Sequence, residues 1–189
     1  MSARIAVLYE DKLATSKPKN FGPHVLVLAC VADLTQCERE LLSRHVDGLP
    51  RKGVGKLLAD CAMPLLLDAY AHVLAVVDDK VRDHLRLPRT ACKMQVRAAM
   101  KAGPYLHAVL LVRNLETVLD SATSVLGRRP LDRKPNPLER DGILLHLAYQ
   151  GLPEQRMQLL EQVPSLKYLV TKLAELLGQL GLLPSSSGA

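Results

Sequence analysis

Short apolar runs that end in acidic residues recur along this chain. In the clearest of them, at residues 72–80, five apolar residues lead directly into Asp78 and Asp79. A short, unbroken and valine-rich run is typical of a strand that is buried on both faces, as in a parallel sheet covered by helices. Charged residues that follow such a strand lie where open α/β sheets bind their ligands. This stretch therefore predicts both a central strand and the first place to look for chemistry.

Two other runs have the same form. Residues 4–9 lead into Glu10, and residues 107–112 are followed by Glu116. Together with residues 73–77 they predict three strands, and the helix-like sequence between them favours parallel pairing. We therefore expect an α/β fold with a mainly parallel sheet flanked by helices.

The segments between these strands are less clear. Residues 24–33 are rich in valine, which favours a strand, but they could also join the helical pattern of residues 34–45 in one long helix. We favour a strand followed by a helix. Residues 47–53 contain two glycines and a proline and predict a turn. Residues 54–70 predict a helix that is interrupted or kinked at Pro64.

The composition changes after residue 127, which divides the chain into an α/β core (1–127) and a C-terminal part. Prolines and basic residues dominate the segment 128–141, which predicts a basic, proline-rich linker or a flap over a substrate. Helical periodicity returns in residues 142–183 and predicts a C-terminal helical extension. We expect the last residues, 184–189, to be a disordered tail.

The bulk composition narrows the classes of function. The chain has 25 Lys and Arg against 19 Asp and Glu, a net charge of +6 that suits phosphate contacts but also simple solubility. Aromatic residues make up 3% and tryptophan is absent, which argues against base-stacking platforms for single strands. The four cysteines lack metal-site spacing, and the sequence contains neither a signal-peptide pattern nor an apolar run of membrane-spanning length. We expect a cytoplasmic protein with reduced core thiols and no membrane partner.

The acids at the strand ends are the candidate catalytic and metal-binding residues. If the three strands are parallel neighbours, their carboxyl ends bring Glu10, Asp78, Asp79 and Glu116 close together. Converging carboxylates repel one another unless a cation compensates them, and oxygen ligands select Mg²⁺ or Mn²⁺. We therefore predict Glu10, Asp78 and Asp79 as metal ligands supported by Glu116. Taken singly, each acid could equally be a turn residue or complement a helix dipole.

Basic residues close to these acids extend the prediction. A metal held by carboxylates can polarise a phosphoryl oxygen and activate water as a nucleophile. Cationic side chains within a few residues could hold the phosphate. The predicted phosphate-binding residues are Lys12, Lys80, Arg82 and Arg113.

These motifs resemble the TOPRIM-like fold. Members of that family carry a glutamate after the first strand and two aspartates after a later one, which bind Mg²⁺ for phosphodiester chemistry. Residues 7–10 (Val-Leu-Tyr-Glu), 76–79 (Val-Val-Asp-Asp) and 112–116 (Val-Arg-Asn-Leu-Glu) are similar to the corresponding elements. The resemblance covers residues 4–120 and implies a small stand-alone bacterial TOPRIM-like protein, a group in which several members are associated with phage defence and some with an ATPase partner.

Two departures from the family pattern keep a second function open. The family spaces its aspartates as Asp-x-Asp, whereas here they are adjacent and Lys80 stands at the second position; Asp11 replaces the usual glycine. The leading prediction is a Mg²⁺-dependent nuclease or other phosphodiester-processing protein that acts on nucleic acid. The alternative is a non-catalytic TOPRIM-like interaction subunit that docks an ATPase or DNA. A third hypothesis is a small-molecule phosphohydrolase that uses the same acids.

Overall fold

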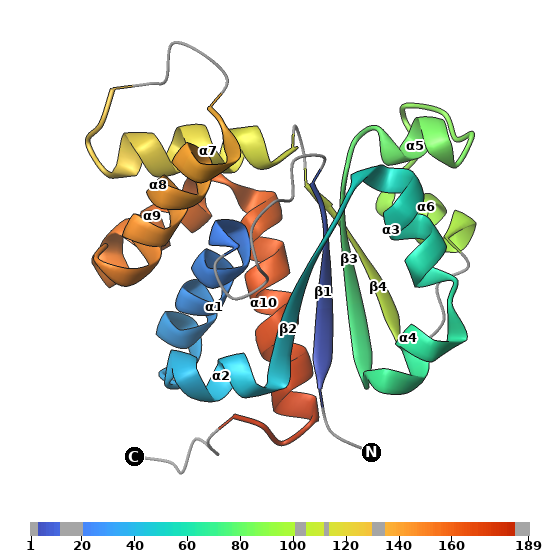
Figure 1. Cartoon of the computed structure of the whole chain (residues 1–189), viewed down its shortest axis with the longest axis horizontal. Coiled ribbons are helices and arrows are strands. Elements are labelled where there is room, and N and C mark those ends of the chain that lie inside the picture. Colours follow the sequence, from blue (N-terminus) through green and yellow to red (C-terminus); the bar gives the residue numbers. More distant parts are fainter. Residues whose placement is uncertain (1–3, 12–20, 101–104, 112–113, 130–134, 184–189) are drawn as a thin grey trace.

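A four-stranded, all-parallel sheet with the strand order β2-β1-β3-β4 forms the centre of the molecule (Figure 1). The computed structural model describes residues 4–11, 21–100, 105–111, 114–129 and 135–183. The strands are β1 (Ile5–Glu10), β2 (Val46–Arg51), β3 (His72–Asp78) and β4 (Leu106–Leu111). The predicted parallel α/β fold is confirmed, and so are the three predicted strands. The predicted tail at 184–189 lies outside the described residues.

Strand β2 lies where the sequence predicted a turn, and that prediction is wrong. β2 is an edge strand that pairs with β1 alone. Proline is tolerated in an edge strand, because its missing N–H can face away from the neighbouring strand. Glycine is required at position 48 because the backbone there passes close to His24: a Cβ atom would lie 2.2 Å from the His24 ring. Glycine and proline in this segment therefore mark an edge strand rather than a turn.

Residues 24–33 form part of helix α1 (Gly22–Thr35), so the strand predicted for this segment is also wrong. Every residue of the helix from Gly22 to Val31 is buried. A helix that is buried on all sides has no polar face, and its sequence cannot be distinguished by periodicity from that of a buried strand. Pro23 lies in the first turn, where proline is tolerated because its missing N–H has no helical partner.

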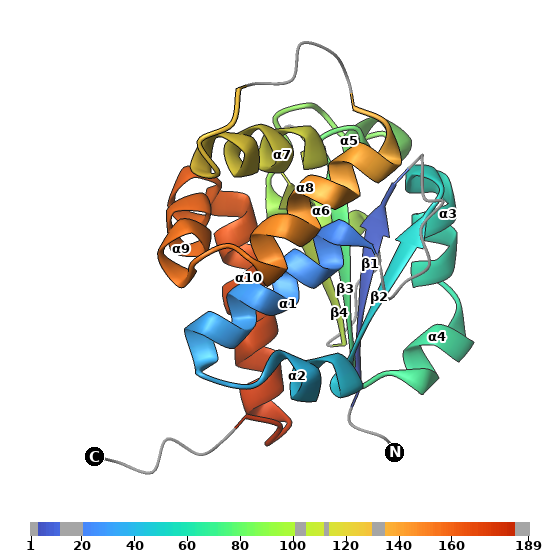
Figure 2. The same cartoon turned by 60° about the vertical axis from the view of Figure 1, so that its left-hand side comes forward.

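The face of the sheet that carries Ile5, Val7, Tyr9, Leu74 and Val76 is covered by six helices, and we call it the broad face (Figure 2). These helices are α1, α2 (Arg39–His45), α7 (Asn114–Val125), α8 (Pro137–Tyr149), α9 (Pro153–Gln162) and α10 (Pro164–Gln179). The C-terminal helices are confirmed, and they share one continuous apolar core with α1 and the sheet. Helix α8 starts at Pro137, so the last residues of the predicted linker 128–141 are helical.

The opposite face, which we call the narrow face, carries the alternate strand residues Ala6, Leu8, Val73, Ala75 and Val77. Four short helices cover it: α3 (Gly53–Cys61), α4 (Pro64–Ala69), α5 (Val81–His84) and α6 (Lys93–Ala99). The helix predicted for residues 54–70 is interrupted before Pro64, and the pieces are α3 and α4.

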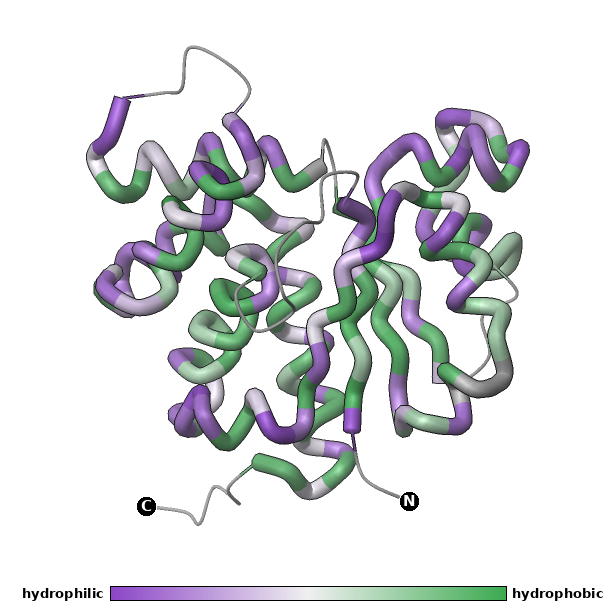
Figure 3. The backbone as a smooth tube through the Cα atoms, viewed as in Figure 1, coloured by the Kyte–Doolittle hydropathy of each residue, from purple (hydrophilic) through white to green (hydrophobic). Residues whose placement is uncertain are grey.

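The hydropathy of the chain follows this layering. Apolar residues line the strands and the inner sides of the helices, whereas the turns around α5 are mostly hydrophilic (Figure 3). Cys30, Cys37 and Cys61 are buried free thiols as expected, but Cys92 is exposed. Within the described ranges, no helix is both long and apolar enough to cross a membrane.

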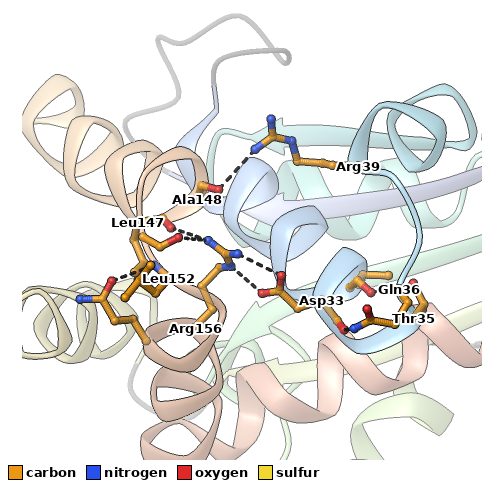
Figure 4. A network of polar contacts seen from close by, with 11 residues as sticks. Asp33, Thr35, Gln36, Arg39, Leu147, Ala148, Leu152 and Arg156 are labelled. Carbon is orange, nitrogen blue, oxygen red and sulfur yellow. Dashed lines mark hydrogen bonds and ion pairs between the residues drawn. The ribbon is translucent and has the colours of Figure 1, made fainter.

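A buried ion pair between Arg156 and Asp33 connects helices of the broad face (Figure 4). The Arg156 guanidinium of α9 donates to both carboxylate oxygens of Asp33 in α1, at 2.6 and 2.9 Å. It also donates to the carbonyl oxygens of Leu147 and Gly151 at the end of α8, at 3.1 and 2.6 Å. The hydrogen bond to Asp33 raises the pKa of Arg156 despite its burial. One side chain thus joins α1 to the consecutive helices α8 and α9, which come much later in the sequence.

Candidate functional site

A cavity of about 210 Å³ opens at the carboxyl ends of the strands, next to the start of α7 and α8. The chain crosses from β1 to β2 on one side of β1 and later returns to β3 on the other side, so the strand order reverses there. Open α/β sheets bind ligands at this kind of position. The charged residues that line the cavity are Glu10, Asp11, Asp78, Lys80, Glu116 and Arg140.

The cavity brings together three of the four predicted acids. Glu10 ends β1, Asp78 ends β3 and Glu116 lies in the first turn of α7. All three line the cavity, together with the predicted phosphate ligand Lys80. Of the other three predicted phosphate ligands, Lys12 and Arg113 lie outside the described residues.

Alternation along the strands distributes the acids around the edge of the sheet. Tyr9 is paired with Val76, and both belong to the broad-face core. The Asp11 amide donates to the Arg51 carbonyl at 2.9 Å, so β1 pairing continues one residue beyond the strand. By this register Asp11 is level with Asp78 and on the same face, whereas Glu10 follows Leu8 on the narrow-face side. The carboxylates therefore surround the end of the sheet instead of forming one tight cluster.

Arg140 compensates the acid deepest in the site. Its Nη2 atom lies 2.9 Å from Asp11 Oδ2 and 2.8 Å from Asp141 Oδ1, and all three side chains are buried. Burial works to lower the pKa of Arg140, but the hydrogen bond and charge of Asp11, together with Asp141, outweigh it and raise this pKa. Arg140 is not among the residues predicted from the sequence, because it lies in the segment predicted as a linker. Asp11 was assigned no role, although it follows Glu10 directly and its position after β1 could have marked it.

Asp78 and Asp79 have different surroundings although they are adjacent. Asp78 Oδ1 accepts a hydrogen bond from the Lys80 amide at 2.8 Å, which shapes the turn from β3 into α5. Asp79 is exposed and pairs with Arg82, whose Nη1 lies 2.6 Å from Asp79 Oδ1. The Arg82 Nε atom donates to the Ala91 carbonyl at 2.9 Å. Asp79 and Arg82, which the sequence predicted as a metal ligand and a phosphate ligand, thus bind each other, and neither is among the residues lining the cavity.

The side chains that line the cavity are of the type that binds a hard divalent cation. Carboxylate oxygens are the ligands that Mg²⁺ and Mn²⁺ prefer. Among the described residues, no three His, Cys, Asp or Glu side chains lie close enough to hold an ion by themselves. Mg²⁺ is commonly held by one or two carboxylates, with water and substrate phosphate completing its shell. The residues fit an ion of that type, held by Glu10 and Asp78 together with a phosphate, rather than one in a cage made wholly by protein.

Comparison with protein family models, with curated proteins and with solved structures finds no match to this chain.

Proposed function

We propose that this chain is a Mg²⁺-dependent phosphodiester hydrolase of TOPRIM-like type that acts on nucleic acid at the strand-end cavity. One observation carries the proposal: Glu10, Asp78 and Glu116 come from three elements far apart in the sequence and line the same cavity beside Lys80. Carboxyl ends of parallel strands meet at one edge of the sheet in any case, but here they line a cavity that also holds a cationic side chain able to bind phosphate. The proposal includes a role in phage defence, with which several TOPRIM-like proteins are associated.

The residues of the cavity divide the chemistry among them. Glu10 and Asp78 would hold the divalent ion, which polarises a phosphoryl oxygen and lowers the pKa of water when it is bound. The Lys80 ammonium would bind a non-bridging phosphate oxygen by a charge-assisted hydrogen bond. Glu116 would accept a proton from the attacking water at a carboxylate oxygen. Arg140 keeps the buried Asp11 charge compensated, which leaves the more exposed acids to the ion.

The adjacent aspartates provide a matched test. In a cleavage assay with Mg²⁺ on DNA and RNA, Asp78→Asn and Glu10→Gln should each reduce the rate by about a hundredfold or more. Asp79→Asn should have little effect, because Asp79 faces Arg82 rather than the cavity. Asparagine at 78 can still accept the hydrogen bond from the Lys80 amide, so the turn should survive. Circular dichroism spectra of all three variants should match that of the wild type.

Two results would contradict this proposal. Cleavage that survives both Glu10→Gln and Asp78→Asn would show that the carboxylates are not required. Cleavage that persists in excess EDTA would show that no divalent ion is required. If Asp79→Asn were as inactive as Asp78→Asn, Asp79 would be required for cleavage as well.

A second function is favoured by the internal ion pairs next to the cavity. Asp79 is paired with Arg82, and Asp11 with Arg140, so two acids of the region are already compensated by the protein. This supports a non-catalytic interaction subunit that uses the same fold to dock an ATPase or DNA. Such a subunit would show no metal-dependent cleavage alone and would co-purify with its partner. A purified chain that cleaves nucleic acid unaided excludes it.

A further inference from the structure

Almost all of the net charge of the chain is concentrated between β3 and β4. Residues 80–97 contain six Lys and Arg against one Asp, a net charge of +5 out of the +6 of the whole chain. The remainder of the sequence is therefore nearly neutral. The segment begins with Lys80, which lines the cavity, and continues through α5 and α6 on the narrow face. The net positive charge is therefore concentrated in one segment, and this segment starts at the candidate site.

The turn after α5 holds its arginines at the surface. Leu85 and Leu87 pack against the narrow-face core, and Arg86 between them is exposed. The Leu87 amide donates to the Arg82 carbonyl at 2.8 Å, and the Arg82 side chain binds the Ala91 carbonyl, so both ends of the turn are fixed. Figures 1 and 3 show this hydrophilic turn beside α5, at the same end of the sheet as the carboxyl end of β3.

Two guanidinium groups of this turn remain available for a ligand. Arg86 and Arg89 are exposed, and within the described part of the chain neither side chain takes part in an ion pair. Arg86 has a φ of 54°, a left-handed conformation that glycine would adopt with less strain. This conformation, which commonly ends a helix, places Arg86 just past the end of α5.

The basic residues farther along the segment have other neighbours. The Lys93 ammonium lies 4.2 Å from the centroid of the Tyr168 ring of α10. Arg97 acts electrostatically on His107, which is near the amino end of β4, away from the cavity. These two residues therefore serve as an internal control for charge that is not close to the site.

We propose that Lys80, Arg86 and Arg89 form a surface that binds the sugar–phosphate backbone of double-stranded nucleic acid and leads it to the cavity; this inference rests on the proposed function. Exposed guanidinium and ammonium groups on a fixed turn match phosphates without reading bases. A single strand would call for aromatic faces on which bases can stack. Tyr9 is the one aromatic side chain among the described residues that line the cavity, and it is buried. Binding should therefore favour duplex and be independent of sequence.

The salt dependence of binding tests this surface. The probe is a short fluorescein-labelled duplex DNA, titrated by anisotropy in EDTA over a series of KCl concentrations. Each phosphate contact contributes about 0.9 to the slope of log K against log salt, so Arg86→Gln/Arg89→Gln should reduce the slope by about 2. Lys93→Gln/Arg97→Gln removes the same charge from the same segment and should reduce it by much less.

A further variant separates binding from folding. Arg86→Gly removes the charge and suits the left-handed conformation, so it should weaken duplex binding without lowering the denaturant midpoint. Equal slopes for the wild type and Arg86→Gln/Arg89→Gln would overturn the proposed surface. So would equal effects of the two double variants, or tighter binding of the labelled single strand than of the duplex.

The same binding data distinguish this inference from the proposed function. Glu10→Gln should bind the duplex with an unchanged salt slope while failing to cleave it. If the wild type cleaves DNA but Arg86→Gln/Arg89→Gln keeps its salt slope, the surface is excluded and the hydrolase stands. If the slope falls as expected but the wild type does not cleave with Mg²⁺, the surface stands and the hydrolase is excluded.

Discussion

The two faces of the sheet use their polar residues in opposite ways. On the broad face, Arg156 is bound to Asp33 and Arg140 to Asp11 and Asp141, all largely buried beneath long helices. On the narrow face, short helices and turns present Arg86 and Arg89 to solvent. The same strands serve both faces, because alternate residues point to opposite sides. Buried ion pairs thus hold the broad-face helices together. On the narrow face Arg51 pairs with Asp60 and Arg82 with Asp79, whereas Arg86 and Arg89 are available to a ligand.

The largest expected effect comes from breaking the broad-face ion pair. Asp33→Ala should lower the free energy of unfolding by about 3 kcal/mol, because it leaves the Arg156 charge buried without its carboxylate. Urea denaturation followed by circular dichroism measures this loss. As a control, Glu175→Ala removes the partner of Lys172 in a more exposed pair of α10 and should cost less than about 1 kcal/mol. Similar losses in both variants would remove the distinction between buried and exposed pairs.

A loss of similar size is expected when the broad face is acidified. Burial lowers the pKa of His24 to about 4, while its imidazole is hydrogen-bonded to the Tyr9 hydroxyl at 3.2 Å. Between pH 6.5 and 4 the unfolded His24 binds a proton that the folded one does not, so acid favours unfolding in this window. The contribution is fully present above pH 6.5 and falls by roughly 3 kcal/mol towards pH 4.

Urea denaturation at several pH values measures this loss, and His24→Asn should flatten the dependence. Burial also lowers the pKa of His107 to about 4, so His107 contributes to the pH dependence in the same window. The contribution of His24 is therefore the difference in the free energy of unfolding between the wild type and His24→Asn. NMR of the wild-type imidazole gives an independent reading: a His24 ring that is protonated in the folded state at pH 6 would contradict the assignment.

The smallest pair of effects compares the space beside two glycines. Gly48→Ala should cost about 1–3 kcal/mol, because its Cβ would overlap the buried ring of His24. Gly55→Ala in α3 of the narrow face should be neutral or add about 0.5–1 kcal/mol, because nothing lies within 4 Å and alanine favours a helix. Thermal unfolding of both variants measures the difference. A destabilised Gly55→Ala with an unaffected Gly48→Ala would reverse the expected contrast.

The sequence predicted those elements whose residues carry a local signature. The strands β1, β3 and β4 are short apolar runs between polar segments, and Glu10, Asp78 and Glu116 were found because they follow such runs. Helix α1 was missed because its burial on all sides removes the polar face that identifies a helix. Strand β2 was missed because an edge position accepts Gly48 and Pro50.

The assignment of the charged side chains depended on contacts that the sequence does not encode locally. Asp79 was grouped with Asp78 by adjacency, but the turn into α5 directs it to Arg82. Arg140 lies far along the chain from Asp11, so their pairing depends on how α8 packs over the end of β1. No pattern within residues 128–141 marks Arg140 as different from the other basic residues of that segment. Tertiary packing therefore decides which acids remain open at the cavity.

The all-round burial of α1 has a consequence for how the protein is made. This apolar helix leaves the ribosome before α8 and α10, the helices that cover it. Until Leu169, Val170 and Leu173 of α10 have emerged, the broad side of the nascent chain exposes a surface that favours aggregation. Its parallel strands add to the delay, since each needs a long crossover before it can pair. The broad-face core is therefore complete only after α10 has emerged and docked.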